Sequence, residues 1–364
     1  MINNSKIEIN RIYNEDCINT MARMPDNFID AIVTDPPYGT SFMSKKWDNI
    51  PGVEIWKDCL RILKPGGHLL AFVGTRTQHR TICNIEDAGF EIRDIIAWVY
   101  GSGFPKNLNI SKAIQKHEGI ELYDTGVISK ISRPNIKEDL YKSGKVGKNF
   151  TIKHVTTLRA KQWEGWGTNL KPALELIVIA RKPLSEKTIA ENVLKWGTGG
   201  LNINECRIKT NKQHDRFPAN LIHDGSDEVM ELFPETKSGL MKKGTKRLNS
   251  VNKNKICYGE YKSDNTFNDT IDDEGSAARF FYCAKASKAD RGKYNIHVTV
   301  KPVKLIKYLI KLVTKVNGLV YDPFIGSGTT AISARMINRN YIGSEIDEDY
   351  IKISEKRLSN VIDI

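Results

Sequence analysis

A predicted strand over residues 29–34 runs without a break into Asp35-Pro36-Pro37-Tyr38, and this junction constrains the fold more than any other feature of the chain. Strand-like and helix-like segments alternate on both sides of it. Such alternation is typical of a mostly parallel sheet with helices on both faces. In the N-terminal part we expect strands over 7–13, 29–34, 68–73 and 92–100, and helices over 55–63 and 78–88.

The same alternation returns near the C-terminus. Apolar residues of segment 302–316 recur at helical spacing, which predicts a helix there. Further helices are expected over 329–338 and 347–358, and strands over 318–321 and 341–343. The sequence therefore predicts an α/β protein whose sheet is built from both ends of the chain.

Two long segments, 103–167 and 183–278, interrupt this pattern. Both are rich in Gly, Lys and Asn and show little periodicity, whereas the strand-like piece 174–180 stands between them. We expect the two segments to form an inserted lobe. The predicted division is an N-terminal half 1–102, insertions 103–167 and 183–278, a core strand segment 168–182 and a C-terminal half 279–364.

The chain of 364 residues has a formal net charge of +12, which favours a polyanionic partner. Basic residues dominate segments 128–162 and 237–262, which we interpret as flexible basic loops; solvated insertions without a partner are the alternative. No apolar stretch approaches the roughly 18 residues of a membrane span, and no signal peptide is evident, so we expect a cytoplasmic protein without a membrane partner. The six cysteines contain no Cys-x-x-Cys pair, so we expect no metal site.

A glycine-rich segment, Asp322-Pro323-Phe324-Ile325-Gly326-Ser327-Gly328-Thr329, joins a predicted strand to a predicted helix. Gly326 and Gly328 let the backbone approach a ligand, and the helix N-terminus offers free N–H groups. The spacing fits neither a dinucleotide fingerprint nor a P-loop, and a tight turn without a ligand is the alternative. Glu345, at the tip of the next strand, is well placed to accept the hydroxyls of a ribose; a charge at a helix N-terminus is its alternative role.

The Asp-Pro-Pro-Tyr motif has acceptors suited to an exocyclic amine of adenine or cytosine. That nitrogen is a poor nucleophile because its lone pair is delocalised into the ring. The Asp35 carboxylate and the Pro36 carbonyl could accept its two hydrogens and localise the lone pair, with Pro37 helping to fix their directions. Tyr38 supplies a ring on which a flipped-out base can stack. A strand-ending turn with an N-capping Asp is the alternative.

Together, the two motifs resemble those of S-adenosylmethionine-dependent DNA amino-methyltransferases of the permuted β group. In that group Asp-Pro-Pro-Tyr precedes the target-recognition region and Phe-x-Gly-x-Gly follows it. The resemblance covers both ends of the chain and the connecting segment 171–175. It implies a Rossmann-like methyltransferase sheet, an inserted target-recognition lobe and S-adenosylmethionine as the cofactor. Segments 101–106, 216–220 and 281–285 are similar to those of solitary methyltransferases of phages and prophages.

The resemblance extends to residues 14–17, where the family places an acid near the adenine amino group of the cofactor. It also includes residues 297–302, which implies Lys301 or nearby backbone around the methionine carboxylate; the family usually has Pro where this chain has Val298. The cofactor-binding residues predicted in this way are Asp16, Cys17, Asp35, Lys301, Asp322, Phe324, Gly326, Ser327, Gly328, Thr329 and Glu345.

The activity implied by the resemblance is transfer of a methyl group to N6 of adenine in double-stranded DNA, with base flipping and no covalent intermediate. The predicted catalytic residues are Asp35, Pro36, Pro37 and Tyr38. N4-cytosine methylation is the same-class alternative, although those enzymes more often have Ser in place of Asp35. Methylation of RNA or of a protein glutamine, and a non-catalytic DNA-binding module, are the remaining alternatives.

Segment 39–48 is expected to form a loop that closes on the target base. Trp163 and Trp166 are interpreted either as stacking residues or as core residues. Homodimers are common in the resembling group, so a homodimer is an assembly that the resemblance allows. The predicted DNA contacts in the loop are Phe42, Lys45, Lys46 and Trp47, with Trp47 as a core residue the alternative for that position.

Overall fold

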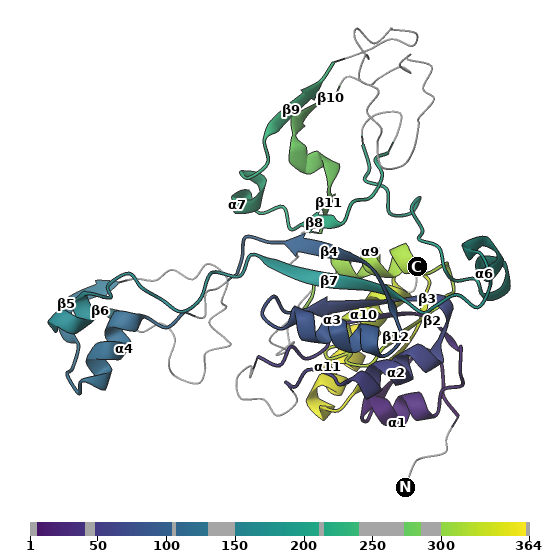
Figure 1. The fold of residues 1–364 in the computed structure, drawn as a ribbon, viewed down its shortest axis with the longest axis horizontal. Coiled ribbons are helices and arrows are strands. Elements are labelled where there is room, and N and C mark those ends of the chain that lie inside the picture. The colour runs from purple at the N-terminus through teal and green to yellow at the C-terminus, as the bar shows by residue number, and fades with distance from the viewer. Residues whose placement is uncertain are drawn as a thin grey trace. The chain divides into compact units, whose positions relative to one another are not determined.

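The computed structural model describes residues 6–40, 48–103, 107–129, 150–210, 215–239, 273–284 and 300–361. It divides into two compact units, one formed by Met1–Gly101 with Leu174–Ile364 and the other by Ser102–Ala173 (Figure 1). The two units are described separately.

A nine-stranded sheet, with strand order β1-β13-β12-β2-β3-β7-β4-β8-β11, forms the centre of the larger unit. β7 pairs antiparallel with β3 and β4, whereas the other neighbouring pairs are parallel. The predicted mostly parallel sheet is therefore confirmed. Its strands are β1 (Arg11–Asn14), β2 (Ile29–Thr34), β3 (Leu63–Val73), β4 (Glu91–Val99), β7 (Leu174–Arg181), β8 (Leu221–His223), β11 (Tyr282–Cys283), β12 (Leu319–Asp322) and β13 (Asn340–Glu345).

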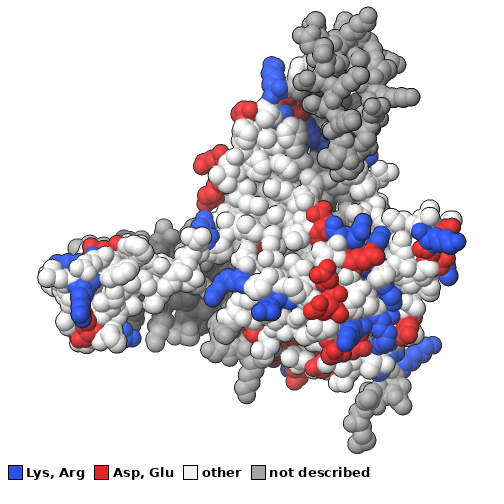
Figure 2. Space-filling view, viewed as in Figure 1, with Lys and Arg blue, Asp and Glu red and all other residues white. Residues whose placement is uncertain are grey.

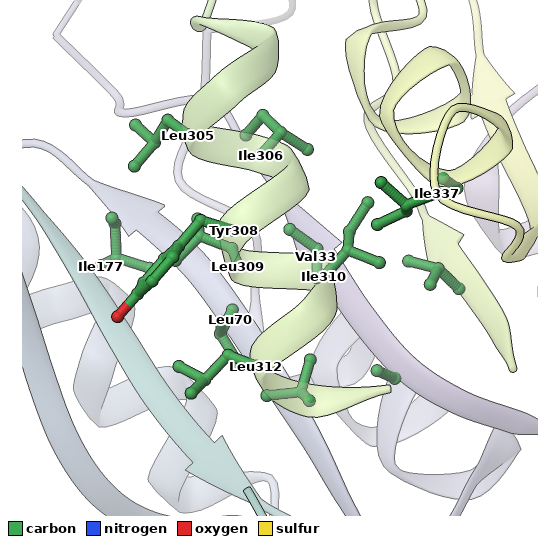
Figure 3. Packing of buried hydrophobic residues seen from close by; sticks show 14 of the residues in the cluster. Val33, Leu70, Ile177, Leu305, Ile306, Tyr308, Leu309, Ile310, Leu312 and Ile337 are labelled. Carbon is green, nitrogen blue, oxygen red and sulfur yellow. The ribbon is translucent and has the colours of Figure 1, made fainter. Parts of the chain in front are cut away.

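Successive residues of a strand point to opposite faces of the sheet, so a strand that is apolar throughout needs cover on both faces. Helices provide that cover. Ala31 and Val33 belong to one buried cluster, whereas Ile32 belongs to the other. The first cluster contains α9 (Figure 3), whose Leu305, Leu309 and other apolar residues pack against the sheet. The helices of this unit are α1 (Cys17–Ala22), α2 (Val53–Ile62), α3 (Gln78–Asp87), α6 (Ile189–Trp196), α7 (Asp227–Met230), α9 (Val303–Val313), α10 (Thr329–Arg335) and α11 (Glu348–Ser359).

Parts of the predicted insertion 183–278 belong to the larger unit. α6 begins with a capping box, in which Thr188 and Glu191 each accept a hydrogen bond from the other's backbone N–H. β8 pairs with β4 and so extends the main sheet. A small hairpin follows, formed by β9 (Glu235–Ser238) and β10 (Asp273–Ser276), before the 3-10 helix η3 (Ala277–Phe280). Periodicity gave no sign of β8 because three residues are too few to show it.

The smaller unit, 102–173, contains α4 (Ile110–His117), β5 (Tyr123–Ser129), β6 (Phe150–His154) and α5 (Leu158–Lys161). Buried Gln115 joins its parts, since its side chain donates to the Glu121 carbonyl and accepts from the Thr156 N–H. Trp163 and Trp166 contact each other edge-to-face, with ring centroids 5.1 Å apart. They are 41% and 60% exposed, so neither is a core residue.

Basic and acidic side chains are interspersed on the visible face of the molecule (Figure 2). Within the described ranges Lys and Arg are nearly balanced by Asp and Glu, so the net charge of +12 comes from the remaining segments of the sequence. Two of these, 130–149 and 240–272, contain most of the predicted basic runs. Among the helices that the structure describes, none is long and apolar enough to cross a membrane.

Candidate active site

A cavity of about 430 Å³ lies where the strands of the larger unit end. Residues after the carboxyl ends of β1, β2, β12 and β13 line it. β7 runs in the opposite direction, so its first residues reach the same edge and bring Glu175 to the cavity. Ligands of open α/β sheets collect at this edge, and the volume falls in the range of about 300–1,000 Å³ that is usual for small-molecule sites.

Four side chains form a carboxylate–lysine cluster on one side of the cavity: Asp35, Tyr38, Glu175 and Lys301. The Lys301 ammonium donates to Asp35 Oδ2 at 2.8 Å and lies 3.1 Å from Glu175 Oε2. The Tyr38 hydroxyl donates to Asp35 Oδ1 at 2.8 Å and accepts from Lys301 at 3.3 Å. Both carboxylate oxygens of Asp35 are therefore held by donors.

The electrostatics of the cluster fix two protonation states. Burial opposes the charge of Lys301, but the carboxylates of Asp35 and Glu175 outweigh it and hold the pKa of Lys301 above its ordinary value. Burial, reinforced by Asp35, raises the pKa of Tyr38 well above its ordinary value. Lys301 is therefore a cation and Tyr38 a neutral hydroxyl across the physiological pH range.

Tyr38 is fixed by contacts on every part of the residue. Asp48 accepts hydrogen bonds from its backbone N–H and from those of Gly39 and Thr40. The Thr77 hydroxyl donates to its carbonyl at 2.7 Å. Its ring lies against Gly74, where an added Cβ would come within 2.9 Å of the ring. Asp48 is the last residue of the expected loop of residues 39–48, and the sequence gave no indication of this role for its carboxylate.

The glycine-rich loop, defined as residues 323–328, forms another part of the cavity wall through residues 323–327. Gly326 has φ of +52° and donates its N–H to Glu345 Oε2 at 2.9 Å. Gly328 has φ of +81° at the N-cap of α10, where a Cβ would lie 2.7 Å from the Ser354 Cβ. Arg357 of α11 donates to the Ser327 carbonyl at 2.5 Å. The loop is thus shaped by backbone geometry and by close packing.

Asp322 connects the two sides of the cavity. Its carboxylate accepts hydrogen bonds from the hydroxyls of Thr34 and Thr330, both at 2.6 Å, and from the Phe324 N–H at 3.0 Å. It is 2% exposed, and burial raises its pKa to about 6 in spite of these donors. Thr34 is the last residue of β2 and directly precedes Asp35, so its hydrogen bond to Asp322 connects the two motifs.

Two further acids line the cavity. The Glu345 carboxylate accepts from the N–H groups of Gly326 and Asp347, and burial raises its pKa. Asp16 caps α1 by accepting from the Ile18 N–H at 2.9 Å. Beside it, burial and Asp16 raise the pKa of Cys17 to about 12, so the thiolate is disfavoured.

Comparison with known proteins identifies the family. Residues 29–356 match the N6_N4_Mtase family, described as DNA methylase. The chain belongs to this DNA methylase family. This family includes both N6-adenine and N4-cytosine DNA methyltransferases.

Individual relatives support this assignment. The Type II methyltransferase M.HindIII of Haemophilus influenzae is 23% identical over 96% of this chain and 95% of its own length. The Type II methyltransferase M.BglII of Bacillus subtilis is 22% identical over 97% of this chain and 70% of its own length. Among solved structures, PvuII DNA methyltransferase (cytosine-N4-specific) has a TM-score of 0.50 at 15% identity, and the match covers 98% of this chain and 90% of that one. This likeness shows the shared fold.

Most residues predicted for the site of this DNA methylase lie together around one cavity. Gly328 does not line it and instead caps α10. Phe42, Lys45, Lys46 and Trp47 lie outside the described residues. The cavity-lining residues from the predicted set are Asp16, Cys17, Asp35, Pro36, Pro37, Tyr38, Lys301, Asp322, Phe324, Gly326, Ser327, Thr329 and Glu345. Their individual roles, the permuted group and the phage-type match stay predictions.

Glu175, Asp48 and Tyr350 also line the cavity, although the sequence predicted no role for them. Glu175 is separated by 126 positions from its ion-pair partner Lys301, so no local pattern could join them. Lys301 also forms an ion pair with Asp35. The resemblance had implied that Lys301 or nearby backbone lies around the methionine carboxylate of the cofactor.

Proposed function

We propose that this DNA methylase transfers a methyl group from S-adenosylmethionine to N6 of adenine in double-stranded DNA. The observation that carries the proposal is the Asp35 carboxylate, held by Tyr38 and Lys301 at the wall of the cavity that the glycine-rich loop also lines. A carboxylate at this position suits an amine with two hydrogens to donate. Both adenine and cytosine carry such an amine, but N4-cytosine enzymes more often have Ser at this position, so Asp35 favours adenine.

Residues on another part of the cavity wall fit the cofactor. The Glu345 carboxylate uses one backbone N–H on each oxygen, which leaves a lone pair on each for ribose hydroxyls. The N-terminus of α10 offers N–H groups beside the glycine-rich loop. When bound, S-adenosylmethionine supplies an activated methyl group on a sulfonium. Asp16, which also lines the cavity, would accept from the adenine amino group of the cofactor.

The chain's own residues would then orient the amine. Each Asp35 oxygen has a second lone pair, so Asp35 can accept one N–H of the target while it keeps its bonds to Tyr38 and Lys301. The Pro36 carbonyl would accept the other N–H, and the Tyr38 ring would stack on the base. The nitrogen lone pair would form the new N–C bond as the C–S bond of the bound cofactor breaks, and the N–H proton that Asp35 accepts would pass to its carboxylate and then to solvent. A covalent cysteine intermediate is disfavoured because the pKa of Cys17 is raised to about 12.

DNA contact is assigned to the smaller unit and to the basic segments. Trp166, 60% exposed beside Trp163, presents a ring that can stack on a base or wedge into a step. Arg159 and Lys161 precede the pair in sequence and could contact phosphates. Phe42, Lys45, Lys46 and Trp47 remain predicted contacts, and segments 103–167 and 183–278 remain the proposed target-recognition regions.

N4-cytosine methylation is the second candidate, because the family includes enzymes of that type. The same four cluster residues would orient that amine, since it also has two hydrogens. The two candidates therefore differ in the base and not in the arrangement of the site.

Nucleoside mass spectrometry separates these candidates. Mixed-sequence duplex DNA would be incubated with the protein and S-adenosylmethionine, digested and analysed. We expect N6-methyladenine from the wild-type protein and none from Asp35→Ala. N4-methylcytosine would overturn the base assignment but keep the site, and no methylated base in any DNA would overturn the proposed function.

A further inference from the structure

Glu175 occupies an unusual position for a residue outside both sequence motifs. It lies at the start of β7, opposite Trp98 of β4, and its carboxylate lines the cavity. Its Oε2 is buried and makes no hydrogen bond within the described residues, yet it lies 3.1 Å from the Lys301 ammonium. A buried carboxylate oxygen is costly unless a charge compensates it. Lys301 supplies that charge.

Lys301 is the centre of the cluster. An ammonium has three N–H donors, and among the described residues its polar neighbours are Asp35, the Tyr38 hydroxyl and Glu175. The side chain is 9% exposed, and the ammonium lies 4.8 Å from the centre of the Phe72 ring. An ammonium placed in this way has little freedom to rotate. Its ion pairs with Glu175 and Asp35 hold it between the two carboxylates.

The charges of the cluster also have a simple balance. Asp35 and Glu175 are two carboxylates, and Lys301 is one cation whose charge both carboxylates stabilise. The cluster thus keeps one negative charge in excess. In methyl transfer to an amine, one positive charge passes from sulfur to nitrogen before a proton leaves. The excess negative charge stays beside that positive charge throughout the step.

We propose that Glu175 is a positioning residue for methyl transfer. It acts through Lys301, which it holds so that Asp35 faces the target amine with a free lone pair, and it supplies the second negative charge of the cluster. This role rests on the proposed function. It assigns Lys301 to the orientation of Asp35 and not to the carboxylate of the cofactor.

The test measures chemistry and cofactor affinity separately in Glu175→Gln, which keeps the shape and removes the charge. Single-turnover methyl transfer to duplex DNA is measured at saturating S-adenosylmethionine, and the Kd of the cofactor is measured by calorimetry. We expect the rate to fall about 10²-fold, because misplaced reacting groups cost that much, while Kd changes less than about threefold. Glu175→Asp, which keeps the charge on a shorter side chain, should recover part of the rate.

A matched control is Glu91→Gln. Glu91 pairs with Arg181 at 2.6 Å across the same two strands, β4 and β7, but it does not line the cavity. The change removes one carboxylate charge from an ion pair, as Glu175→Gln does, but at the other end of β7. We expect its rate and Kd to match those of the wild-type protein.

Coupling to Lys301 provides the second test. Lys301→Met leaves two carboxylates without their cation, and removing Glu175 as well relieves part of that repulsion. The rate loss of the Glu175→Gln, Lys301→Met double variant should therefore be smaller than the product of the two single losses.

Each result has a definite meaning. Wild-type rates in Glu175→Gln, a loss confined to cofactor Kd, or rate losses that multiply would each overturn the positioning role while methyl transfer by the wild-type protein still stands. If the wild-type protein transfers no methyl group, the proposed function fails and this role fails with it.

Discussion

Asp35 follows β2 and Asp322 ends the neighbouring strand β12, but the surroundings of the two residues differ. Asp35 is paired with a lysine whose charge a second carboxylate supports. Asp322 is held by two hydroxyls and a backbone N–H, and its pKa is raised to about 6. Charge is thus concentrated where the reacting amine is expected, whereas neutral donors connect the strands. Substitutions on the two sides should therefore separate chemistry from cofactor binding and stability.

Asp322→Asn should remove the largest pH-dependent contribution to stability. The pKa of Asp322 in the folded protein, about 6, lies above its ordinary value of 3.8, so the folded state keeps a proton that the unfolded chain has released. This contribution is present below about pH 4 and is lost as pH rises through about 6, with a total of about 3 kcal/mol.

Denaturant unfolding of the wild-type protein and of Asp322→Asn between pH 4 and 7 checks this. The free energy of unfolding of the wild-type protein should decline relative to that of the variant across the interval. Parallel curves for the two proteins would show that Asp322 does not bind its proton more tightly in the folded state.

Glu345→Gln should weaken cofactor binding without changing the chemical step. Loss of the charged acceptor for the ribose hydroxyls should raise the Kd of S-adenosylmethionine about tenfold or more. A hydrogen bond to a charged group contributes about 1.5–3 kcal/mol, which corresponds to a change of that size. The single-turnover rate at saturating cofactor should stay within about threefold. Calorimetry and rapid-quench assays give both values.

A control for this change is Glu348→Gln. Glu348 begins α11, three positions further along the chain, and pairs with Lys352 on the surface. Its Kd should equal that of the wild-type protein. If Glu345→Gln slows the chemical step and leaves Kd unchanged, the division between the two sides of the cavity is wrong.

Gly328→Ala should have the smallest effect of the three. Its φ of +81° and the approach to Ser354 should cost about 1–3 kcal/mol of stability. Gly89→Ala is the control, since Gly89 has φ of +106° and faces only the end of the Leu60 side chain at 3.1 Å. Thermal unfolding should show a loss in both variants, with weaker cofactor binding in Gly328→Ala alone. Equal effects on Kd would contradict a role of the glycine-rich loop in binding.

The sequence predicted the parts of the molecule that depend on short stretches of chain. The strand over 29–34 and the helix beginning at Thr329 lie where periodicity and the glycine-rich segment placed them. β8 escaped prediction because three residues carry no periodicity, and it joins the sheet through pairing with a distant strand. The Glu175–Lys301 pair escaped for a similar reason. Only the antiparallel direction of β7 brings its first residues to the edge where β2 ends.

The most direct test of the account is the single-turnover rate of methyl transfer to duplex DNA by Asp35→Ala at saturating S-adenosylmethionine. We expect a loss of at least about 10²–10³-fold, because a group that stabilises the transition state is removed, with cofactor Kd changed only a few fold. A rate near that of the wild-type protein would contradict the central claim that the Asp35 carboxylate orients the target amine.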